Sequence, residues 1–245
     1  VTEEEKEGIP HHLLDFKEVT EEYTIYHYQK DCREKIKDIQ SRNKTPILVG
    51  GTGLYIKAAL YDYKLSEEKS TNTYDNLTNE ELYEELKKLD KDIIIDKDNR
   101  RRLIRAINYY KENNESINKN KTNKLLYNVI FIGLTTDRQI LYDKINKRVD
   151  EMISQGLLEE VKSFYDKGIK SKPLLNAIGY RELYNYLDGN GTKEEAIEKI
   201  KQNSRHYAKR QYTFFNHQLP VVWFETDYNN FNNTIEKVAS YIDSN

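Results

Sequence analysis

Apolar residues recur at helical spacing in several long segments of the chain, and charged residues fill the positions between them. Thr192 followed by Glu195 is the sequence signature of a capping box, which favours a helix start at that point. Asn79 is a candidate N-cap for another helix. The spacing predicts helices over residues 22–42, 53–60, from 79 onward, 98–113, 137–154, 157–167, 192–216 and from 230 towards the end.

Short continuous apolar runs occur at three places, which are residues 46–51, 127–134 and 220–224. They lack the polar alternation of a sheet with one wet face, so they are typical of buried strands in a parallel sheet. Helices separate the three runs along the chain, and polar segments at 62–78 and 112–124 are predicted loops. The pattern indicates a mixed or parallel α/β core with a largely helical insertion.

Composition narrows the class of protein. A length of 245 residues allows one large domain, or one core with a smaller domain. The single cysteine, Cys32, excludes a disulfide framework and a cysteine-based metal site, and it suits a reducing cytosol. The sequence contains no run of about 18 apolar residues, so it predicts no membrane span. A net charge of −2 argues against bulk binding of polyanions, but it leaves room for local basic patches.

A glycine-rich turn follows the first predicted strand and opens a helix in the sequence GGTGLY, residues 50–55. Gly50, Gly51 and Gly53 permit a tight turn and a close approach of the backbone to a ligand. The N–H groups at the start of the following helix can receive an anion, and Thr52 adds a hydroxyl group. An ordinary turn between a strand and a helix explains the pattern equally well. The turn is not a Walker A motif, which needs Lys and Ser or Thr after its last glycine.

The first basic group consists of Arg101, Arg102 and Arg105, which lie three or four residues apart and share one face of a predicted helix. Asp96 and Asp98 could pair with only one or two of these guanidinium groups. Unpaired guanidinium groups favour phosphate as a ligand, whereas the alternative is a solvated helix face.

The second basic group consists of Arg205, Lys209 and Arg210, within the sequence SRHYAKRQYTFF. Tyr207 lies between these cations and Phe214 follows them, and both add aromatic surface. Cations can bind phosphates while rings stack on unpaired bases, so the pattern is typical of nucleic-acid binding. For Tyr207 and Phe214, however, packing in the core is the favoured interpretation.

A further arginine, Arg181, follows a glycine near the start of a helix in NAIGYRE. It could bind a pyrophosphate, or it could pair with Glu182 or Glu160. His11 and His12 are adjacent in an extended segment, so their side chains point apart and form no ready metal pair.

Six blocks of sequence together identify a resemblance that covers nearly the whole chain. The chain resembles the tRNA dimethylallyltransferase family, also called isopentenyl-tRNA transferases, in which such blocks occur in the same order. The blocks are GIPHHLLD (8–15), PILVGGTGLYIKAAL (46–60), NRRRLIRA (99–106), DRQILYDKINKRVDEMISQGLLEEV (137–161), AIGYRE (177–182) and SRHYAKRQYTFF (204–215).

The resemblance implies an α/β fold with a P-loop NTPase-like parallel-sheet core, whose N-terminal strand and loop are not among these residues. The core would comprise residues 1–61 and 125–245 with the C-terminal helices, and a helical insertion domain would comprise 62–124. The implied reaction moves a dimethylallyl group from dimethylallyl diphosphate to the exocyclic amine of the adenosine 3′ of the anticodon, with Mg²⁺ assisting the diphosphate. The target base would be flipped out of its stack. The implied partners are a tRNA anticodon stem-loop and dimethylallyl diphosphate; we also expect a cytoplasmic monomer with no membrane contact.

Residue roles carry over by motif. Thr52 in the turn of Gly50, Gly51 and Gly53 corresponds to a catalytic residue that contacts the target adenosine. Arg181 corresponds to an arginine that binds the diphosphate, with Arg205 or Lys209 as weaker candidates. No residue is assigned to a metal. The implied tRNA-binding residues are Arg101, Arg102, Arg105, Arg205, His206, Tyr207, Lys209 and Arg210.

The sequence departs from the family in ways that affect its expected activity. The phosphate-binding loop G-x-T-x-S-G-K-T and the DS-x-Q segment, whose Asp is the expected general base, are not found in these 245 residues. Asn108 stands where the family has Glu. We therefore expect the chain to begin inside the family's usual sequence and to be inactive or nearly so on its own. One alternative is a non-catalytic tRNA-binding fragment; a small-molecule kinase relative is disfavoured, because it has no need for the two basic groups.

Overall fold

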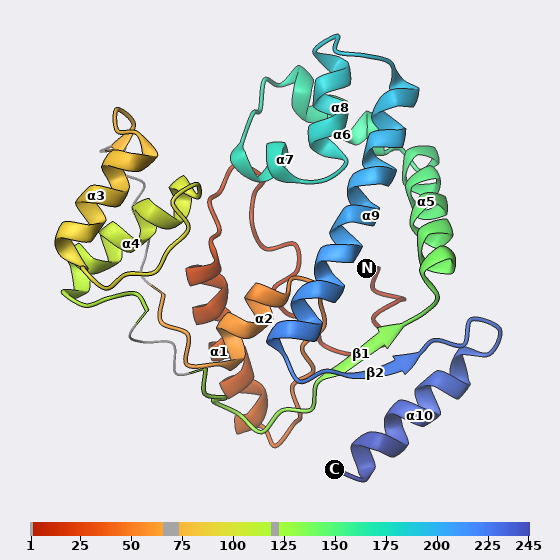
Figure 1. Cartoon of the computed structure of the whole chain (residues 1–245). Coiled ribbons are helices and arrows are strands. Elements are labelled where there is room, and N and C mark those ends of the chain that lie inside the picture. The colour runs from red at the N-terminus through yellow and green to blue at the C-terminus, as the bar shows by residue number, and fades with distance from the viewer. Residues whose placement is uncertain (1, 66–73, 119–122) are drawn as a thin grey trace. The chain divides into compact units, whose positions relative to one another are not determined.

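The computed structural model describes residues 2–65, 74–118 and 123–245 (Figure 1). Its described residues divide into two compact units. The first unit takes residues within 1–23, 48–54 and 129–245, and the second takes residues within 24–47 and 55–128. No helix of the described residues has both the length and the apolar character needed to cross a membrane.

The first unit contains a small parallel sheet. Strand β1 (Ile132–Thr135) pairs with β2 (Val222–Glu225), and Ile132 lies opposite Val222. Gly133 is needed in β1 because a Cβ there would lie 2.4 Å from a ring carbon of Trp223. The C-terminal helix α10 (Phe231–Asp243) packs against β2.

The strand expected at residues 46–51 is absent from the described structure, so that prediction is wrong. Ile47 and Val49 are 84% and 87% exposed, instead of buried. A strand needs a neighbour to satisfy its backbone N–H and C=O groups. The described residues place no such neighbour beside this apolar run. The other two apolar runs do contain strands, although β1 begins later than residue 127.

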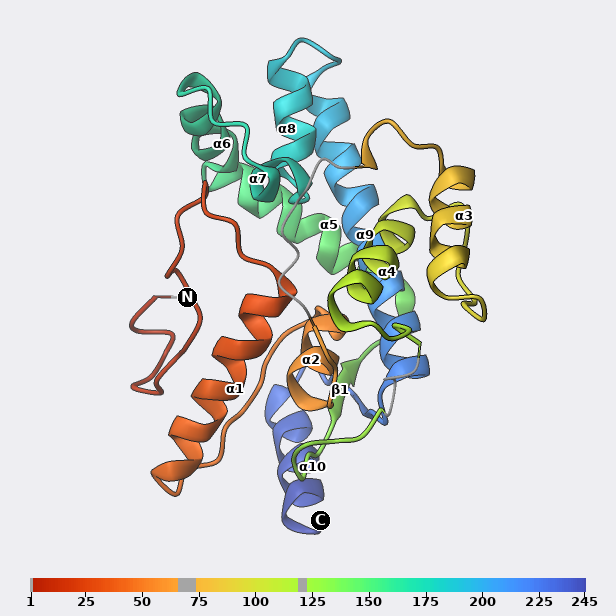
Figure 2. The ribbon, with the colours of Figure 1, turned by 90° about the vertical axis from the view of Figure 1, so that its left-hand side faces the viewer.

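Five helices between β1 and β2 form a second part of the first unit, and two of them pack directly on α9. Helices α5 and α8 lie alongside α9 in both ribbon views, and α6 packs on α8 (Figures 1 and 2). The predicted helices in this part of the chain are confirmed, whereas the short α7 was not predicted. Their bounds are α5 Arg138–Ser154, α6 Leu157–Asp166, α7 Lys172–Asn176, α8 Tyr180–Leu187 and α9 Lys193–Gln218. Their shared core is made by Val149, Leu157, Val161, Leu183, Tyr184, Ala196 and Ile200.

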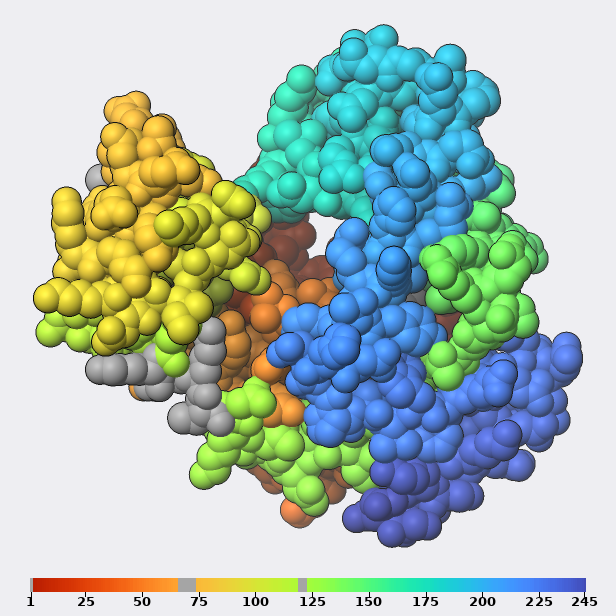
Figure 3. All heavy atoms as spheres, viewed as in Figure 1, coloured from red at the N-terminus to blue at the C-terminus, as the bar shows by residue number. Residues whose placement is uncertain are grey.

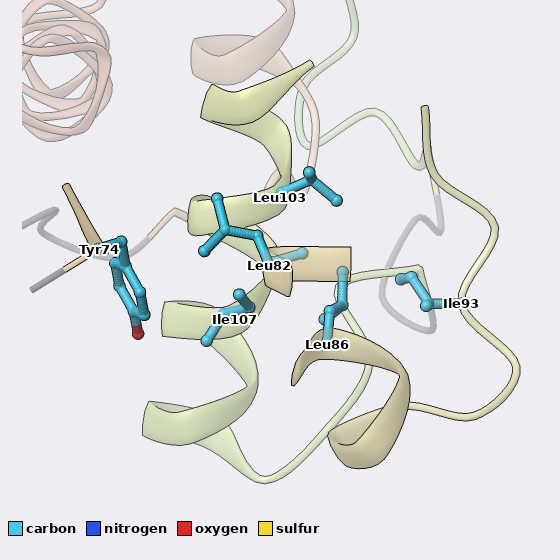
Figure 4. Packing of buried hydrophobic residues seen from close by; sticks show 7 residues of the cluster. Tyr74, Leu82, Leu86, Ile93, Leu103 and Ile107 are labelled. Carbon is cyan, nitrogen blue, oxygen red and sulfur yellow. The ribbon is translucent and has the colours of Figure 1, made fainter. Parts of the chain in front are cut away.

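In the second unit, α3 (Asn79–Leu89) and α4 (Arg100–Asn113) pack together around a core of their own. Figure 4 shows the side chains that meet there, which are Tyr74, Leu82, Leu86, Ile93, Leu103 and Ile107. The N-cap of α3 is Thr78, whose side chain accepts from the Glu81 N–H, and not the expected Asn79. Thr78 with Glu81 forms a capping box, which a residue at the first helical position cannot do.

The remaining helices of the second unit are held together through the end of α2. This helix spans Gly53–Leu60, and α1 spans Ile25–Ser41. Arg33 of α1 donates to the carbonyl oxygens of Ala58, Ala59 and Tyr61, over 2.5–3.0 Å. The last carbonyls of a helix lack partners within it, so this cation stabilises the end of α2.

The domain boundaries expected from the sequence stay a prediction. Tyr61 forms an antiparallel bridge with Leu125, and the Asp62 N–H donates to the carbonyl of Lys124. The chain thus enters and leaves the expected insertion, 62–124, at one place. The compact second unit is larger, because it also contains α1 and part of α2.

Candidate functional site

The glycine turn packs directly on α9, and this contact explains two of its glycines. The Gly51 carbonyl accepts from Gln211 Nε2 at 3.0 Å, and a Cβ on Gly51 would lie 2.0 Å from that nitrogen. A Cβ on Gly53 would lie 2.3 Å from Phe214 Cδ1. Gly50 has nothing within 4 Å of such a position, so close packing does not require a glycine there.

Thr52 lies at the exposed tip of this turn. Its Oγ1 is 3.3 Å from the hydroxyl oxygen of Tyr207. Tyr207, Gln211 and Phe214 follow one another by four and three residues, so a single face of α9 supports the whole turn. Phe214 packs as the sequence favoured, but Tyr207 remains 37% exposed. The expected core role of Tyr207 is therefore wrong, because its hydroxyl reaches outward to Thr52.

The second basic group lies on the same helix, but its members do different things. Arg205 donates to Asn146 Oδ1 of α5 at 2.5 Å and is partly buried. Lys209 and Arg210 are exposed, as is His206, and the Arg210 guanidinium lies 5.7 Å from the centre of the Tyr207 ring. Figure 3 shows the atoms of α9, in blue, forming an open surface of the first unit. Exposed cations on this surface are accessible to phosphate groups, and their role in binding tRNA stays a prediction.

The first basic group lies at the start of α4 in the second unit. Arg101 and Arg102 are exposed, and their side chains make no hydrogen bond or ion pair with the described residues. Arg105 is partly buried and has interactions of its own. Arg100 turns inward and donates to the carbonyls of Leu77 and Tyr74, both at 2.6 Å. Arg100 therefore has a structural role, whereas Arg101 and Arg102 are exposed cations.

Arg181 pairs with its neighbour Glu182, which is one of the alternatives that the sequence left open. Its Nη2 and Nε lie 2.6 and 3.1 Å from Glu182 Oε1. Glu182 is buried, and it also accepts from the Gly179 N–H at 2.8 Å and from Asn203 Nδ2 at 2.7 Å. Burial alone would raise the pKa of Glu182, but the hydrogen bonds from Arg181, Gly179 and Asn203 outweigh it and lower the pKa.

This network fixes the position of the Arg181 guanidinium, which remains about half exposed. Glu160, the other possible partner, accepts instead from the Tyr180 hydroxyl. Burial and this bond to Glu160 raise the pKa of Tyr180. Sequence analysis missed Asn203 and Gln211 as supporting residues, and it named Glu182 only as a possible partner of Arg181. The spacing of Gly179 and Glu182, three apart at a helix start, was the signal for the further bond from the Gly179 N–H to Glu182.

The expected Mg²⁺ can be compared with the metal-ligating side chains of the described residues. Across the described part of the chain, no group of three or more His, Cys, Asp or Glu side chains gathers into a metal site. Mg²⁺ in diphosphate chemistry is commonly held by one or two carboxylates together with phosphate oxygens, so it needs no such group. The role of magnesium therefore stays a prediction.

Comparison with known proteins places these features in a family. The family model described as IPP transferase matches residues 1–218. A tRNA dimethylallyltransferase of Anoxybacillus flavithermus is 47% identical over 253 residues, which cover 99% of this chain and 81% of that protein. A relative with the same name from Geobacillus thermodenitrificans is 45% identical over 256 residues, with the same coverage.

Solved structures agree with this. A tRNA isopentenylpyrophosphate transferase of Bacillus halodurans is 39% identical with a TM-score of 0.73, covering 100% of this chain and 80% of that chain. A eukaryotic dimethylallyltransferase acting on tRNA is 25% identical with a TM-score of 0.83, covering 97% of this chain and 65% of that chain. The match of the family model and the similarity over nearly the whole chain show that the chain belongs to the IPP transferase family.

Proposed function

We propose that this chain is a tRNA prenyltransferase, which transfers a dimethylallyl group from dimethylallyl diphosphate to the exocyclic amine of the adenosine 3′ of the anticodon. One observation carries the proposal beyond family membership. The glycine turn holds the Thr52 hydroxyl in the open, 3.3 Å from the hydroxyl of Tyr207 on α9. The guanidinium of the exposed Arg210 lies 5.7 Å from the centre of the same Tyr207 ring. Two hydroxyl groups beside a cation suit a base whose phosphate is bound nearby.

The chemistry needs stabilisation of a leaving diphosphate. In the transfer, the bond from the allylic carbon to the diphosphate oxygen breaks and its electron pair leaves with the diphosphate. The amine nitrogen then forms the new bond to carbon and loses a proton, which an oxygen of the departing diphosphate or a water molecule can accept. Positive groups held in place before the reaction stabilise the departing charge most effectively. Arg181 is such a group, because Glu182 fixes one edge of its guanidinium.

Thr52 would act on the acceptor. Its exposed hydroxyl can donate to or accept from the edge of an adenine that has left its stack. Mg²⁺ would neutralise the diphosphate oxygens, and the expected general base is not found among these residues. The cytoplasmic location and the monomeric state also stay predictions, and no step above depends on them.

Binding of the stem-loop would rest on exposed cations. Arg101 and Arg102 carry charges without partners in the described structure, and Lys209 and Arg210 are exposed on α9. Because the net charge of the chain is −2, these local groups would have to carry the attraction for RNA. Each phosphate that they neutralise releases counterions, so the affinity should fall steeply as salt is added.

The test is the affinity of the chain for a synthetic anticodon stem-loop over a range of salt concentrations. Replacing Arg101 and Arg102 together by Gln should weaken binding. The slope of log K against log salt is negative, and its magnitude should fall by about 1.4–1.8. A matched variant, Lys88→Gln with Lys91→Gln, removes the same charge from exposed positions in the same unit. It should leave the slope near that of the unchanged chain. Affinity that does not depend on salt, or equal losses in both variants, would contradict the proposal.

Transfer of a labelled prenyl group to the same RNA separates the two readings of the sequence. We expect little transfer by these 245 residues, because the phosphate-binding loop of the family is not among them. Salt-dependent binding without product is the result expected both from the loss of activity and from a non-catalytic tRNA-binding fragment. Turnover comparable with that of the Anoxybacillus flavithermus relative would contradict the expected loss of activity and would exclude the fragment.

A further inference from the structure

A hollow of about 270 Å³ lies at the carboxyl end of β1, within the first unit. It is formed where β1 ends, where α5 begins and along one side of α9. Ligands of parallel α/β proteins commonly bind outside the carboxyl ends of the strands. No acidic side chain is among the lining residues, which are Thr135, Thr136, Arg138, Leu141, Tyr142, Lys209 and Tyr212.

The arginine of this hollow is held in a fixed position by a tyrosine. Arg138 Nε donates to the Tyr142 hydroxyl at 3.1 Å, and its guanidinium carbon lies 5.1 Å from the centre of the Tyr142 ring. These contacts use one edge and one face of the guanidinium, and they leave its terminal nitrogens available. Neither Arg138 nor Lys209 forms an ion pair with a carboxylate of the described chain. The hollow therefore holds two positive charges that its surroundings do not neutralise.

The opposite wall is rigid and supplies hydroxyl groups. The Tyr212 hydroxyl lies 2.6 Å from Thr135 Oγ1, and the Tyr212 ring stacks on Trp223 at 5.1 Å between ring centres. Trp223 is fixed in turn by a hydrogen bond from Nε1 to Asn216 Oδ1 at 2.9 Å. Guanidinium, ammonium and hydroxyl donors around one small space match the oxygens of a phosphate group.

We propose that this hollow binds a backbone phosphate of the RNA, as a contact separate from the site of prenyl transfer. The inference rests on the proposed function. Lys209 and Tyr212 project from α9 at about 200° and 140° from Tyr207, given about 100° per residue. They lie on the opposite side of α9 from the face that supports Thr52. A diphosphate that reacts beside Thr52 cannot also occupy the hollow, whereas an RNA chain extends far enough to reach both sides of one helix.

The experiment compares Arg138→Gln with Arg148→Gln, which removes the same charge from an exposed position on the same helix, outside the hollow. The probes are the synthetic anticodon stem-loop and inorganic pyrophosphate. Arg138→Gln should weaken stem-loop binding about 3- to 10-fold and reduce the magnitude of the slope of log K against log salt by about 0.7–0.9. Arg148→Gln should change neither quantity, and pyrophosphate binding should be equal in both variants.

A second variant keeps the charge and tests the positioning of the guanidinium. Tyr142→Phe removes the hydroxyl that accepts from Arg138 Nε, so it should weaken stem-loop binding by a smaller factor and leave the salt slope unchanged. Normal helix content by circular dichroism shows that each variant has folded.

Three outcomes would overturn the proposal or its basis. If Arg138→Gln binds the stem-loop like the unchanged chain while the Arg101 and Arg102 variant is weakened, the hollow binds no RNA phosphate, but the proposed function stands. Loss of pyrophosphate binding alone in Arg138→Gln would make the hollow a site for a small phosphate compound. Stem-loop binding that no variant and no salt concentration affects would remove the proposed function itself.

Discussion

At the scale of single residues, the site depends on two glycines, whose lack of a side chain permits close packing. Gly51 and Gly53 let the turn approach Gln211 and Phe214 more closely than any residue with a Cβ could. Gly50 lies in the same turn without such a neighbour. The three glycines look equivalent in the sequence, but only two of them are required by packing.

This difference gives a matched pair of substitutions. Gly53→Ala should lower the free energy of unfolding by about 1–3 kcal/mol, because the new Cβ would meet the Phe214 ring at 2.3 Å. Gly50→Ala should stay within about 0.5 kcal/mol of the unchanged chain. Urea unfolding of the two variants measures the difference. Equal stability of the two would mean that the turn does not pack on α9 as described.

Glu182 leads to a prediction about pH. Its pKa is lowered from an ordinary value of 4.5, so the charged carboxylate stabilises the fold above that pH. The stabilisation is lost as the pH falls through the lowered pKa of the folded state. Glu182→Gln should therefore cost about 2 kcal/mol at pH 7, and the difference from the unchanged chain should shrink below pH 4.5.

Urea unfolding at a series of pH values checks this expectation. Glu236→Gln, at an exposed position on α10, is the control and should show no such trend. A constant difference between Glu182→Gln and the unchanged chain down to about pH 3 would show that the carboxylate is not the source of the stability.

At the scale of elements, α3 and α4 form a pair with a core that does not depend on the sheet. Leu82, Leu86, Leu103 and Ile107 are fully buried between them. Tyr74 extends this core, and its hydroxyl donates to Asn108 Oδ1 at 3.0 Å. Asn108 thus has a structural partner here. The pair presents Arg101 and Arg102 from a rigid support.

The support can be weakened without touching the cations. Leu103→Ala should destabilise the pair by about 2–5 kcal/mol, because it leaves a cavity in a closely packed core. Ile94→Ala, at a side chain that is 89% exposed, should cost less than about 0.5 kcal/mol. Hydrogen exchange would show the loss as faster exchange in α3 and α4 of the Leu103 variant. Unchanged protection there would contradict the described core.

At the scale of the whole molecule, the net charge of −2 gives no sign of the exposed cations on which the proposed function depends. Acidic residues outnumber basic ones by 41 to 39, yet exposed cations occur in both compact units. Many of the other cations are paired on the surface, as Lys162 is with Asp166. Such exposed pairs add little stability, but they leave the unpaired cations as the groups available to phosphate.

The sequence was sufficient to predict most helices, because amphipathic spacing is a local property of each segment. Residues 53–60 were expected to be helical, and α2 has those bounds. Strands were less predictable, since a strand exists only beside a partner. The apolar run at residues 46–51 resembles the runs that contain β1 and β2, yet it forms no strand with the described residues.

For the site, the sequence by itself determined the family, the glycine turn and the residue types that could bind phosphate. Only the tertiary structure decided how each cation is used. Arg205 turns to Asn146, Arg181 is held by Glu182, and Arg138, which the sequence did not single out, lines a hollow with Lys209. The physical reason is that a charge takes its role from the groups around it. Those groups come from distant parts of the chain, and folding alone brings them together.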